Sequence, residues 1–419
     1  MRENVFHVKI SSLEKERQAI RAVWGQNMKQ TGDLNLVKKI NKSIVLHHIR
    51  TNSPISRARI AEITGLTKAT VSSLVNELIE SSVVEEIGVG ESSGGRKPMM
   101  LLFNGTAGYA IGVDLGVNDI LAVLTDLSGK IIREVRVQHD NASVEKVVQL
   151  LKTTIRGLIE GAPESVYGII GIGIGVPGIC DESGNLLFAP NLGWENVPLK
   201  QQIEETFNIP VVIDNEANAG AVGEKQFGAG KDTANLVYVS IGIGIGAGII
   251  IKGDLYRGAT GFSGEIGHIS IQHDGPKCSC GSLGCWELYA SEHALLTQAR
   301  RELNDDTVDL EALLSKAEAG DPKVIALFER LGYYLGVGVV NIINGYNPEY
   351  IILGGRLASS ERWLMKPLLA LLEKRSLPHP RKQLKVAFSE LSDRSTVLGA
   401  ASFAVATFFV ETTVSVDRN

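Results

Sequence analysis

Residues 278–285 read Cys278-Ser279-Cys280-Gly281-Ser282-Leu283-Gly284-Cys285, and a histidine, His268, stands ten positions before them. Three of the four cysteines in the chain fall within this short run. Three thiolates and one imidazole complete a tetrahedral zinc site of the structural kind, in which no position stays open for water. We therefore predict a zinc-braced loop held by His268, Cys278, Cys280 and Cys285. His273 is a rival to His268, and a redox or coincidental cysteine cluster is the alternative interpretation.

The bulk composition is that of an ordinary folded protein. The chain has 419 residues, of which 44% are hydrophobic and 21% are charged, so we expect two or three domains with cores of their own. No uncharged apolar run reaches the length of about 18 residues that spans a membrane. The amino terminus lacks the apolar core of a secretory signal. Together with reduced, metal-bound thiols, these features predict a cytoplasmic protein.

Charge is distributed unevenly along the chain. Residues 1–34 carry six basic and four acidic side chains, and residues 35–103 carry nine and six. The two segments therefore have net charges of +2 and +3, which leaves −10 for residues 104–419 in a chain whose total is −5. This asymmetry indicates that a polyanionic partner docks at the amino-terminal end.

Residues 35–103 have the pattern of a helix-turn-helix domain. Apolar residues at helical spacing from 36 to 49 predict a first helix that ends near residues 52–54, and a short second helix covers 56–63 before Gly65. Thr67 is expected to cap a third helix with a buried stripe. The stripe consists of Val71, Leu74, Val75 and Leu78. A short helix, a glycine turn and a capped helix together define the motif.

The outward face of the third helix is small and polar, which suits entry into a DNA major groove with Lys68 on a phosphate. Two β-rich runs, 83–89 and 99–103, follow and are joined by a basic loop, so we expect a hairpin wing. The alternative is a small three-helix protein-interaction module. The residues predicted to contact DNA are Arg57, Thr67, Lys68, Ala69, Thr70, Ser72, Ser73, Asn76, Arg96 and Lys97.

Residues 1–34 form an N-terminal extension with only loose apolar periodicity. It is interpreted either as a frayed helical arm or as sequence that precedes a genuine start at Met28. No chemistry is assigned to it.

Beyond residue 104 the pattern changes to alternating strands and helices. Strands are predicted at 109–114, 120–126, 131–137 and 169–176 with a helix at 144–159, and a related unit has strands at 236–240 and 248–251 with helices at 291–302, 321–344 and 364–373. Two copies of one strand-hairpin-helix unit indicate an α/β body of two lobes that face a ligand-binding cleft.

Several motifs of this body resemble those of the ROK family. They are Asp114-Leu115-Gly116, Asn215-Glu216-Ala217-Asn218, Gly264-Glu265-Ile266-Gly267-His268, the cysteine cluster with Glu287, and Leu353-Gly354-Gly355. The family comprises sugar kinases and sugar-responsive repressors with an actin-like fold, a duplicated ribonuclease H-like body of two lobes. The resemblance covers about residues 35–410. The preceding winged helix is similar to that of the repressors, and residues 53–98 most resemble xylose repressors of Gram-positive bacteria.

The resemblance implies a division of the body as well. Residues 104–228 with 395–412 would form a smaller α/β lobe, and residues 229–394 would form a larger lobe with the zinc loop and a dimerisation surface. The winged helix-turn-helix domain would be residues 35–103.

Three parts that the kinases of this family need are altered here. Glu216 stands in place of an aspartate base and is one methylene longer, which displaces a catalytic carboxylate. In the first phosphate turn, Val117 restricts close backbone approach and Asp119 would repel a phosphate. In the second turn, Ile243 removes a hydroxyl donor. We therefore expect no enzymatic activity, with a sugar kinase that carries an appended DNA-binding domain as the alternative.

The resemblance further implies that a sugar faces Asn191, Asn215, Glu216, Glu265, His268 and Glu287. His268 would place one ring nitrogen on zinc and the other on a sugar hydroxyl. The expected protein is a homodimeric repressor, with a tetramer left open, that binds palindromic double-stranded operator DNA and has no membrane partner. A sugar, by the resemblance D-xylose, would close the lobes and release the operator. A zinc-stabilised interaction module without a ligand is the remaining alternative.

Overall fold

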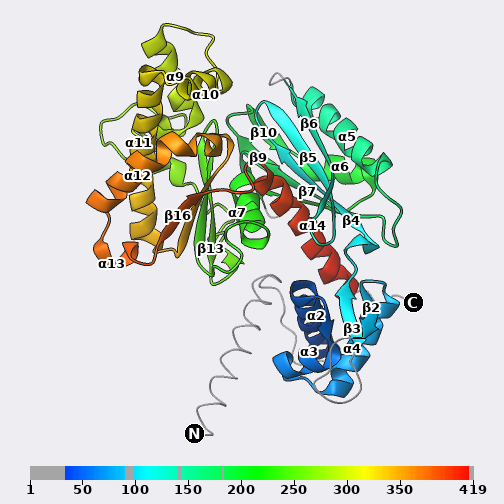
Figure 1. The fold of residues 1–419 in the computed structure, drawn as a ribbon. Coiled ribbons are helices and arrows are strands. Elements are labelled where there is room, and N and C mark those ends of the chain that lie inside the picture. The colour runs from blue at the N-terminus through cyan, green and yellow to red at the C-terminus, as the bar shows by residue number, and fades with distance from the viewer. Residues whose placement is uncertain (1–33, 90–98, 140–142, 182–183, 415–419) are drawn as a thin grey trace.

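The computed structural model describes residues 34–89, 99–139, 143–181 and 184–414, and these residues form a winged helix and two α/β lobes (Figure 1). The fold class expected from the sequence is confirmed. The predicted wing-tip residues Arg96 and Lys97, and the extension as far as residue 33, lie outside the described residues.

The winged helix combines three helices with a three-stranded antiparallel sheet in the order β1-β3-β2. Its elements are α2 (Leu34–Asn52), β1 (Ile55–Ser56), α3 (Arg57–Thr64), α4 (Lys68–Glu80), β2 (Val84–Val89) and β3 (Met99–Phe103). The local signals are confirmed: Gly65 ends α3 with φ 70°, and the Thr67 hydroxyl accepts a hydrogen bond from the Thr70 backbone N–H at 3.1 Å. The predicted stripe of α4 is buried. Strand β1 is too short for any sequence pattern to indicate it.

The smaller lobe is built on a five-stranded mixed sheet in the order β11-β7-β4-β5-β6. Its strands are β4 (Tyr109–Leu115), β5 (Asp119–Asp126), β6 (Ile131–Gln138), β7 (Ile169–Val176) and β11 (Val211–Asn215). Helices α5 (Val144–Glu160) and α6 (Leu199–Phe207) share a hydrophobic core with one face of this sheet. A short 3-10 turn, η1 (Gly105–Ala107), precedes the sheet, and a small antiparallel sheet of β8 (Ile179–Cys180), β9 (Leu186–Ala189) and β10 (Trp194–Val197) extends it.

The larger lobe has a second five-stranded sheet in the order β14-β13-β12-β15-β16. Its strands are β12 (Leu236–Ile241), β13 (Ile245–Ile251), β14 (Asp254–Leu255), β15 (Tyr350–Gly354) and β16 (Lys385–Phe388), and its helical segments are η2 (Ile266–His268), α8 (Glu287–Ala290), α9 (Glu292–Leu303), α10 (Leu310–Glu318), α11 (Pro322–Tyr346), η3 (Arg356–Ser360), α12 (Glu361–Arg375) and α13 (Pro378–Arg381). Strand β13 begins three residues earlier than predicted.

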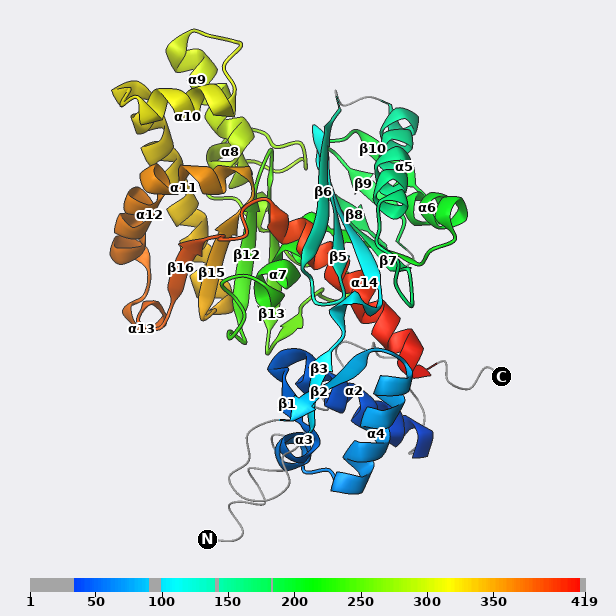
Figure 2. The ribbon, with the colours of Figure 1, turned by 45° about the vertical axis from the view of Figure 1, so that its right-hand side comes forward.

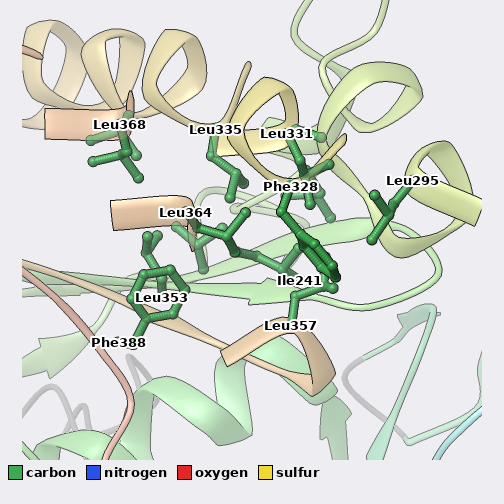
Figure 3. Packing of buried hydrophobic residues seen from close by; sticks show 14 of the residues in the cluster. Ile241, Leu295, Phe328, Leu331, Leu335, Leu353, Leu357, Leu364, Leu368 and Phe388 are labelled. Atoms are coloured by element: carbon green, nitrogen blue, oxygen red, sulfur yellow. The ribbon is translucent and has the colours of Figure 1, made fainter. Parts of the chain in front are cut away.

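The core of the larger lobe lies between this sheet and the helices α9, α11 and α12. Figure 3 shows Phe328 of α11 and Leu364 of α12 packed over Ile241 and Leu353 of the sheet. Among the described residues, α11 is the one helix long and apolar enough to cross a membrane, and 56% of its apolar window is buried in the structure. Such burial is typical of a core helix.

Two helices lie between the sheets of the two lobes: α7 (Glu216–Gln226) and α14 (Arg394–Val414) (Figures 1 and 2). Their backbones approach so closely that a Cβ at Gly399 would lie 1.7 Å from the Ala219 carbonyl oxygen. A Cβ at Gly173 of the sheet would similarly lie 1.8 Å from the Ala400 carbonyl oxygen. Helix α14 is therefore wedged against both α7 and the smaller sheet, and no larger residue fits at these two positions.

The far end of α14 packs against the winged helix. Ala401, Val405 and Phe408 share a hydrophobic cluster with side chains of α2 and β3. The Tyr167 and Phe408 rings meet edge to face with their centroids 5.0 Å apart. The Tyr167 hydroxyl also donates a hydrogen bond to the Ser81 carbonyl oxygen at 2.7 Å. One helix thus connects the space between the lobes with the DNA-binding domain.

Candidate DNA-binding surface and interlobe site

The residues predicted to contact DNA form one surface on α3 and α4, apart from the two in the wing loop. Lys68, Ala69, Ser73 and Asn76 are exposed on α4, together with the cap Thr67, while Thr70 and Ser72 are half-buried beside them. These side chains point away from the buried stripe, so the face that would enter a groove is free of core packing.

Arg57 ties this surface to the wing. Its guanidinium pairs with Glu86 of β2 and donates a hydrogen bond to Asn76 Oδ1 at 3.0 Å. The contact fixes the start of α3 against α4 and the wing strand. Sequence reasoning selected Arg57 and Asn76 separately, whereas the structure holds them together.

The cysteine cluster has the geometry of a metal site. The ligand atoms of His268, Cys278, Cys280 and Cys285 all lie within 4.8 Å of one another. The Cys280 and Cys285 sulfurs are 3.7 Å apart, as are the Cys278 sulfur and His268 Nδ1. A tetrahedral ion with metal–sulfur bonds near 2.3 Å separates two of its sulfurs by roughly 3.8 Å. The four residues therefore fit a metal ion, and the sulfurs are too far apart for a disulfide.

The fold also decides between the two candidate histidines. The His273 side chain is 96% exposed and pairs with Asp274, whereas His268 turns Nδ1 toward the sulfurs. Nδ1 also lies 3.3 Å from Glu287 Oε1, and the opposite ring nitrogen, Nε2, lies 3.8 Å from Glu265 Oε2. The His268 ring therefore has Nδ1 beside the Cys278 sulfur and Glu287, and Nε2 on the side of Glu265.

A cavity of about 110 Å³ lies between the lobes. Its walls carry residues of both sheets and of α14, which include Asp114, Asn191, Glu216, Ser240, Gly244 and Thr396. A Cβ at Gly244 would lie 3.0 Å from Glu287 Oε2 and 3.5 Å from Asn191 Nδ2. Glu287 thus reaches the edge of the cavity where Asn191 enters it from the other lobe.

Asn215 plays a different part from the other predicted sugar ligands. Its Oδ1 accepts a hydrogen bond from the Ala217 backbone N–H at 2.8 Å, and its Nδ2 donates to the Gly178 carbonyl oxygen at 3.0 Å. The amide therefore caps α7 and fixes the position of Glu216, the first residue of that helix.

Two half-buried carboxyl groups, Asp114 and Glu216, line the cavity. Burial raises the pKa of Glu216 to about 7. The Ser240 hydroxyl, which donates to Glu216 Oε1 at 3.5 Å, acts in the opposite direction and lowers this pKa. Burial and the Glu216 charge raise the pKa of Asp114 well above its ordinary value. Among the described residues nothing hydrogen-bonds to Asp114 Oδ1. At neutral pH this end of the cavity consequently favours a proton or a hydrogen-bond donor over further negative charge.

Ion pairs line the cavity beside the altered first phosphate turn at Gly116. Arg136 of β6 pairs with both Asp119 and Asp393, and Arg394 pairs with Glu134 at 2.7 Å. Sequence reasoning noted Asp119 as repulsive to phosphate but missed Arg136, which lies on an alternating strand and is 257 residues from its partner. The pairs fasten β6 to the start of α14.

Helix α14 begins at the cavity wall. Thr396 lines the cavity, and its hydroxyl donates to the Glu216 carbonyl oxygen at 3.3 Å. A change of lobe position at Glu216 would therefore act on the same helix that packs against the winged helix.

Comparison with known proteins identifies the class. A family model for the ROK family matches residues 110–407, and one for the MarR family matches residues 39–92. The two family matches thus divide the chain as the fold does, into a DNA-binding domain and the two-lobed body that follows it. The chain belongs to the ROK family, as the sequence motifs indicated.

Its relatives include named repressors. The xylose repressor of Bacillus spizizenii is 45% identical over 376 residues, which cover 90% of this chain and 97% of that protein. The N-acetylglucosamine repressor of Escherichia coli O157:H7 is 30% identical over 379 residues, or 88% of this chain and 93% of that protein.

Solved structures of a regulator and of a kinase differ in the share of this chain that they cover. A ROK family transcriptional regulator, a homologue of the E. coli MLC protein, is similar with a TM-score of 0.77 at 28% identity and covers 90% of this chain and 99% of its own. A ROK glucokinase from Streptomyces griseus, in complex with glucose and AMPPNP, has a TM-score of 0.64 at 31% identity and covers 70% of this chain and 98% of its own. The regulator matches a larger share of this chain than the kinase does.

Proposed function

We propose that this chain is a sugar-responsive transcriptional repressor whose effector is D-xylose. The observation that carries the proposal is helix α14, which lines the interlobe cavity at Thr396 and packs against the winged helix at Phe408. The identity of 45% to a xylose repressor over most of both chains supports the choice of sugar.

The DNA-binding part is assigned to the exposed face of α4 and to the wing. A homodimer, and in a higher assembly a tetramer, would place two such faces on a palindromic operator with half-sites about one helical turn or a multiple apart. Lys68 and the wing residues Arg96 and Lys97 would contact phosphates, while Ser73 and Asn76 would reach base edges. The protein acts in the cytoplasm.

The sugar site is assigned to Asn191, Glu216, Glu265, His268 and Glu287, with Asn215 included because its amide positions Glu216. Carboxylates and amides at fixed angles bind neighbouring hydroxyls, and a sugar that lacks one of them leaves a buried polar group unpaired.

The metal is assigned as structural zinc, held by three thiolates and His268 Nδ1. Zinc would fix the His268 tautomer so that Nε2 carries the proton. The Nε2–H group would then donate a hydrogen bond to a sugar hydroxyl or to Glu265. Because all four ligands come from the protein, the ion would brace the loop and perform no chemistry.

Sugar would act by closing the lobes around Glu216, and α14 would carry the movement to the winged helix. A difference of roughly 1–3 kcal/mol in sugar affinity between the two lobe positions would change operator occupancy about 5- to 150-fold. Repression is thereby relieved without unfolding of either domain.

Phosphoryl transfer is not part of the proposal. Asp119 and Asp393 place negative charge on the phosphate side of the cavity, and their partner Arg136 is engaged by both. The identity of 31% to a glucokinase makes a sugar kinase the second candidate. A coupled assay of ATP consumption across pentoses and hexoses decides between them, because turnover with any sugar would contradict the repressor-only function.

The main test measures operator release. A duplex selected from a random pool by the full-length protein would be retarded in a gel, and D-xylose should abolish the retardation. Phe408→Ala should retain xylose binding by calorimetry yet release the duplex less readily, because α14 then packs less firmly against the winged helix. Tyr167→Phe, which removes only the hydrogen bond to Ser81, should weaken the response less.

Leu369→Ala provides a control for this test, since Leu369 is 46% exposed on α12 and is not part of the hydrophobic cluster that α14 shares with the winged helix. It should respond to xylose as the parent protein does. Retardation unchanged by every pentose and hexose would refute the sugar-responsive mechanism, and an unaltered response in Phe408→Ala would refute the role of α14.

A further inference from the structure

One corner of the larger lobe has a charge opposite to that of the body around it. Residues 362–385 contain seven Lys or Arg side chains and a single acidic residue, Glu373. The body as a whole, residues 104–419, has a net charge of −10. We define the basic corner as the four side chains Lys374, Arg375, Lys382 and Lys385.

The charges of the basic corner are presented to solvent. All four side chains are exposed, and none of them forms an ion pair with another described residue. Other basic side chains near the cleft, such as Arg136 and Arg257, are paired with carboxylates. Four uncompensated cations in an acidic body form a local positive field that attracts a polyanion.

The corner is held in a fixed shape. The end of α12, the short α13 and the start of β16 carry it, and Arg381 joins the first two by donating to the Glu373 carbonyl oxygen at 2.5 Å. The Ser376 hydroxyl donates to the Leu372 carbonyl oxygen at 2.5 Å. The positive charges therefore sit on a rigid turn and not on a loose loop.

Its position relates it to the DNA-binding domain. In both views, which differ by rotation about the vertical axis, α13 lies at the lower end of the larger lobe, on the side from which the winged helix projects (Figures 1 and 2). The winged helix binds at the operator, and the duplex continues beyond the half-site for further helical turns.

We propose that the basic corner binds the phosphate backbone of duplex DNA that flanks the operator half-sites. Such contacts carry no sequence information, but they add affinity through the release of counterions. The acidic remainder of the body would repel the duplex elsewhere, so the flank would be held at this corner. The inference rests on the proposed operator binding by the winged helix and adds a second contact to it.

The test uses the full-length protein without sugar and two duplexes. One carries only the operator core selected from a random pool, and the other carries the same core with about two helical turns (~20 base pairs) of unrelated sequence on each side. Binding is measured by fluorescence anisotropy at several salt concentrations, for the parent protein and for a variant in which all four residues of the basic corner are changed to Gln.

The parent protein should bind the long duplex more tightly and with a steeper dependence on salt than the short one. The variant should show no such difference, and its slope of log affinity against log salt should be shallower by about 0.9 for each phosphate that it no longer neutralises. Its affinity for the short duplex should equal that of the parent.

A matched control removes the same number of exposed cations from the opposite end of the body. It changes Lys146, Arg301, Lys316 and Lys323 to Gln; these lie on α5, α9, α10 and the first turn of α11. The control should keep the full preference for the long duplex, which separates a local contact from a general effect of net charge.

Three outcomes would overturn the inference. The parent protein could bind both duplexes equally, or the variant could keep the preference. The variant could also elute as a smaller assembly than the parent in gel filtration, which would make the corner a contact between subunits. Failure of the parent protein to select any duplex is a separate result, because it would overturn the proposed operator binding itself.

Discussion

The two ends of the interlobe cleft can be compared residue by residue. At the end proposed to bind sugar, Asn191 lines the cavity, and Glu265, His268 and Glu287 supply carboxylate and imidazole groups between it and the cysteine cluster. At the phosphate end, Asp119, Arg136 and Asp393 form ion pairs. Among the described residues, no Lys or Arg pairs with the carboxylates of the first end, which contact the His268 ring, whereas Arg136 pairs with both aspartates at the second end.

Under the proposed function, ligand recognition and phosphoryl transfer would use separable parts of this fold. A kinase needs both ends in working order, because a sugar hydroxyl must meet a phosphate that is held in place. A repressor needs only the sugar end and a path from it to the DNA-binding domain. Each of the following experiments changes one end and asks whether the other responds.

The largest effect is expected from Cys280→Ala at the sugar end. Loss of one thiolate should remove the metal from a four-ligand site, so the metal content by mass spectrometry should fall from about one ion per chain to near zero. The affinity for xylose should fall at least about tenfold because His268 is no longer anchored. Cys180→Ala, at the half-buried fourth cysteine, is the matched control and should keep the metal. Retention of metal in Cys280→Ala would show that the cluster is not a metal site.

Glu265→Gln should give the next largest effect. Glu265 lies 3.8 Å from His268 Nε2, and a hydrogen bond to a charged group contributes about 1.5–3 kcal/mol. The affinity for xylose in calorimetry should therefore fall roughly 10- to 150-fold, while the metal stays bound. Glu361→Gln, an exposed change at the start of α12, should leave the affinity unaltered. Equal affinity for Glu265→Gln and the parent would remove Glu265 from the sugar site.

Glu216→Gln examines the centre of the cleft through pH. In the folded protein the pKa of Glu216 is raised to about 7, so between about pH 4.5 and 7 only the unfolded chain is ionised at this residue. The free energy of unfolding of the parent should consequently fall as pH rises through this window. The variant lacks this decrease and should be more stable than the parent at pH 8 by roughly 3 kcal/mol, with a smaller difference at pH 5. Thermal unfolding at several pH values measures this, and a pH-independent difference would argue against the raised pKa.

The smallest effect is expected from Arg136→Gln at the phosphate end. Its ion pairs are partly exposed, with the Arg136 side chain 39% accessible, so the stability should fall by only about 1 kcal/mol or less. The affinity for xylose should change by less than about twofold, and ATP consumption should stay absent. A large loss of sugar affinity would contradict the separation of the two ends.

The winged helix was predictable because its signals are local. Gly65 and Thr67 act within one turn of the chain, and the buried stripe of α4 repeats at a fixed spacing. Neither signal depends on a distant part of the sequence. The same holds for the ten strands and helices predicted in the body, whose ends differ from the predictions by at most three residues.

Helices α7 and α14 could not be recognised in the same way. Gly220 and Gly223 argue against a helix on propensity alone. In the folded protein, however, a Cβ at Gly220 would lie 2.2 Å from the Tyr238 ring, and one at Gly223 would lie 2.0 Å from the Ser395 carbonyl oxygen. Helix α14 packs on several sides, so it has no polar face for a periodicity to reveal. Tertiary contacts therefore determine both helices.

The residue types of the candidate site were predictable, but the contacts that each residue makes were not. The spacing of the cysteines indicated a metal cluster, but only the fold shows which histidine turns toward it. Asn215 came from resemblance, and its actual use as a helix cap depends on the carbonyl of Gly178 from another strand end. Arg136 and Asp393 meet across most of the chain, a distance that no local pattern reports.

The length of α14 has a mechanical consequence. Its 21 residues span about 31 Å at 1.5 Å per residue. Tilting so long a rod by only about 10° would swing its distal tip by about 5 Å, more than the ~3.4 Å step between base pairs. Small adjustments around a bound monosaccharide would thus be magnified into a displacement of the winged helix by one to two base-pair steps along the DNA.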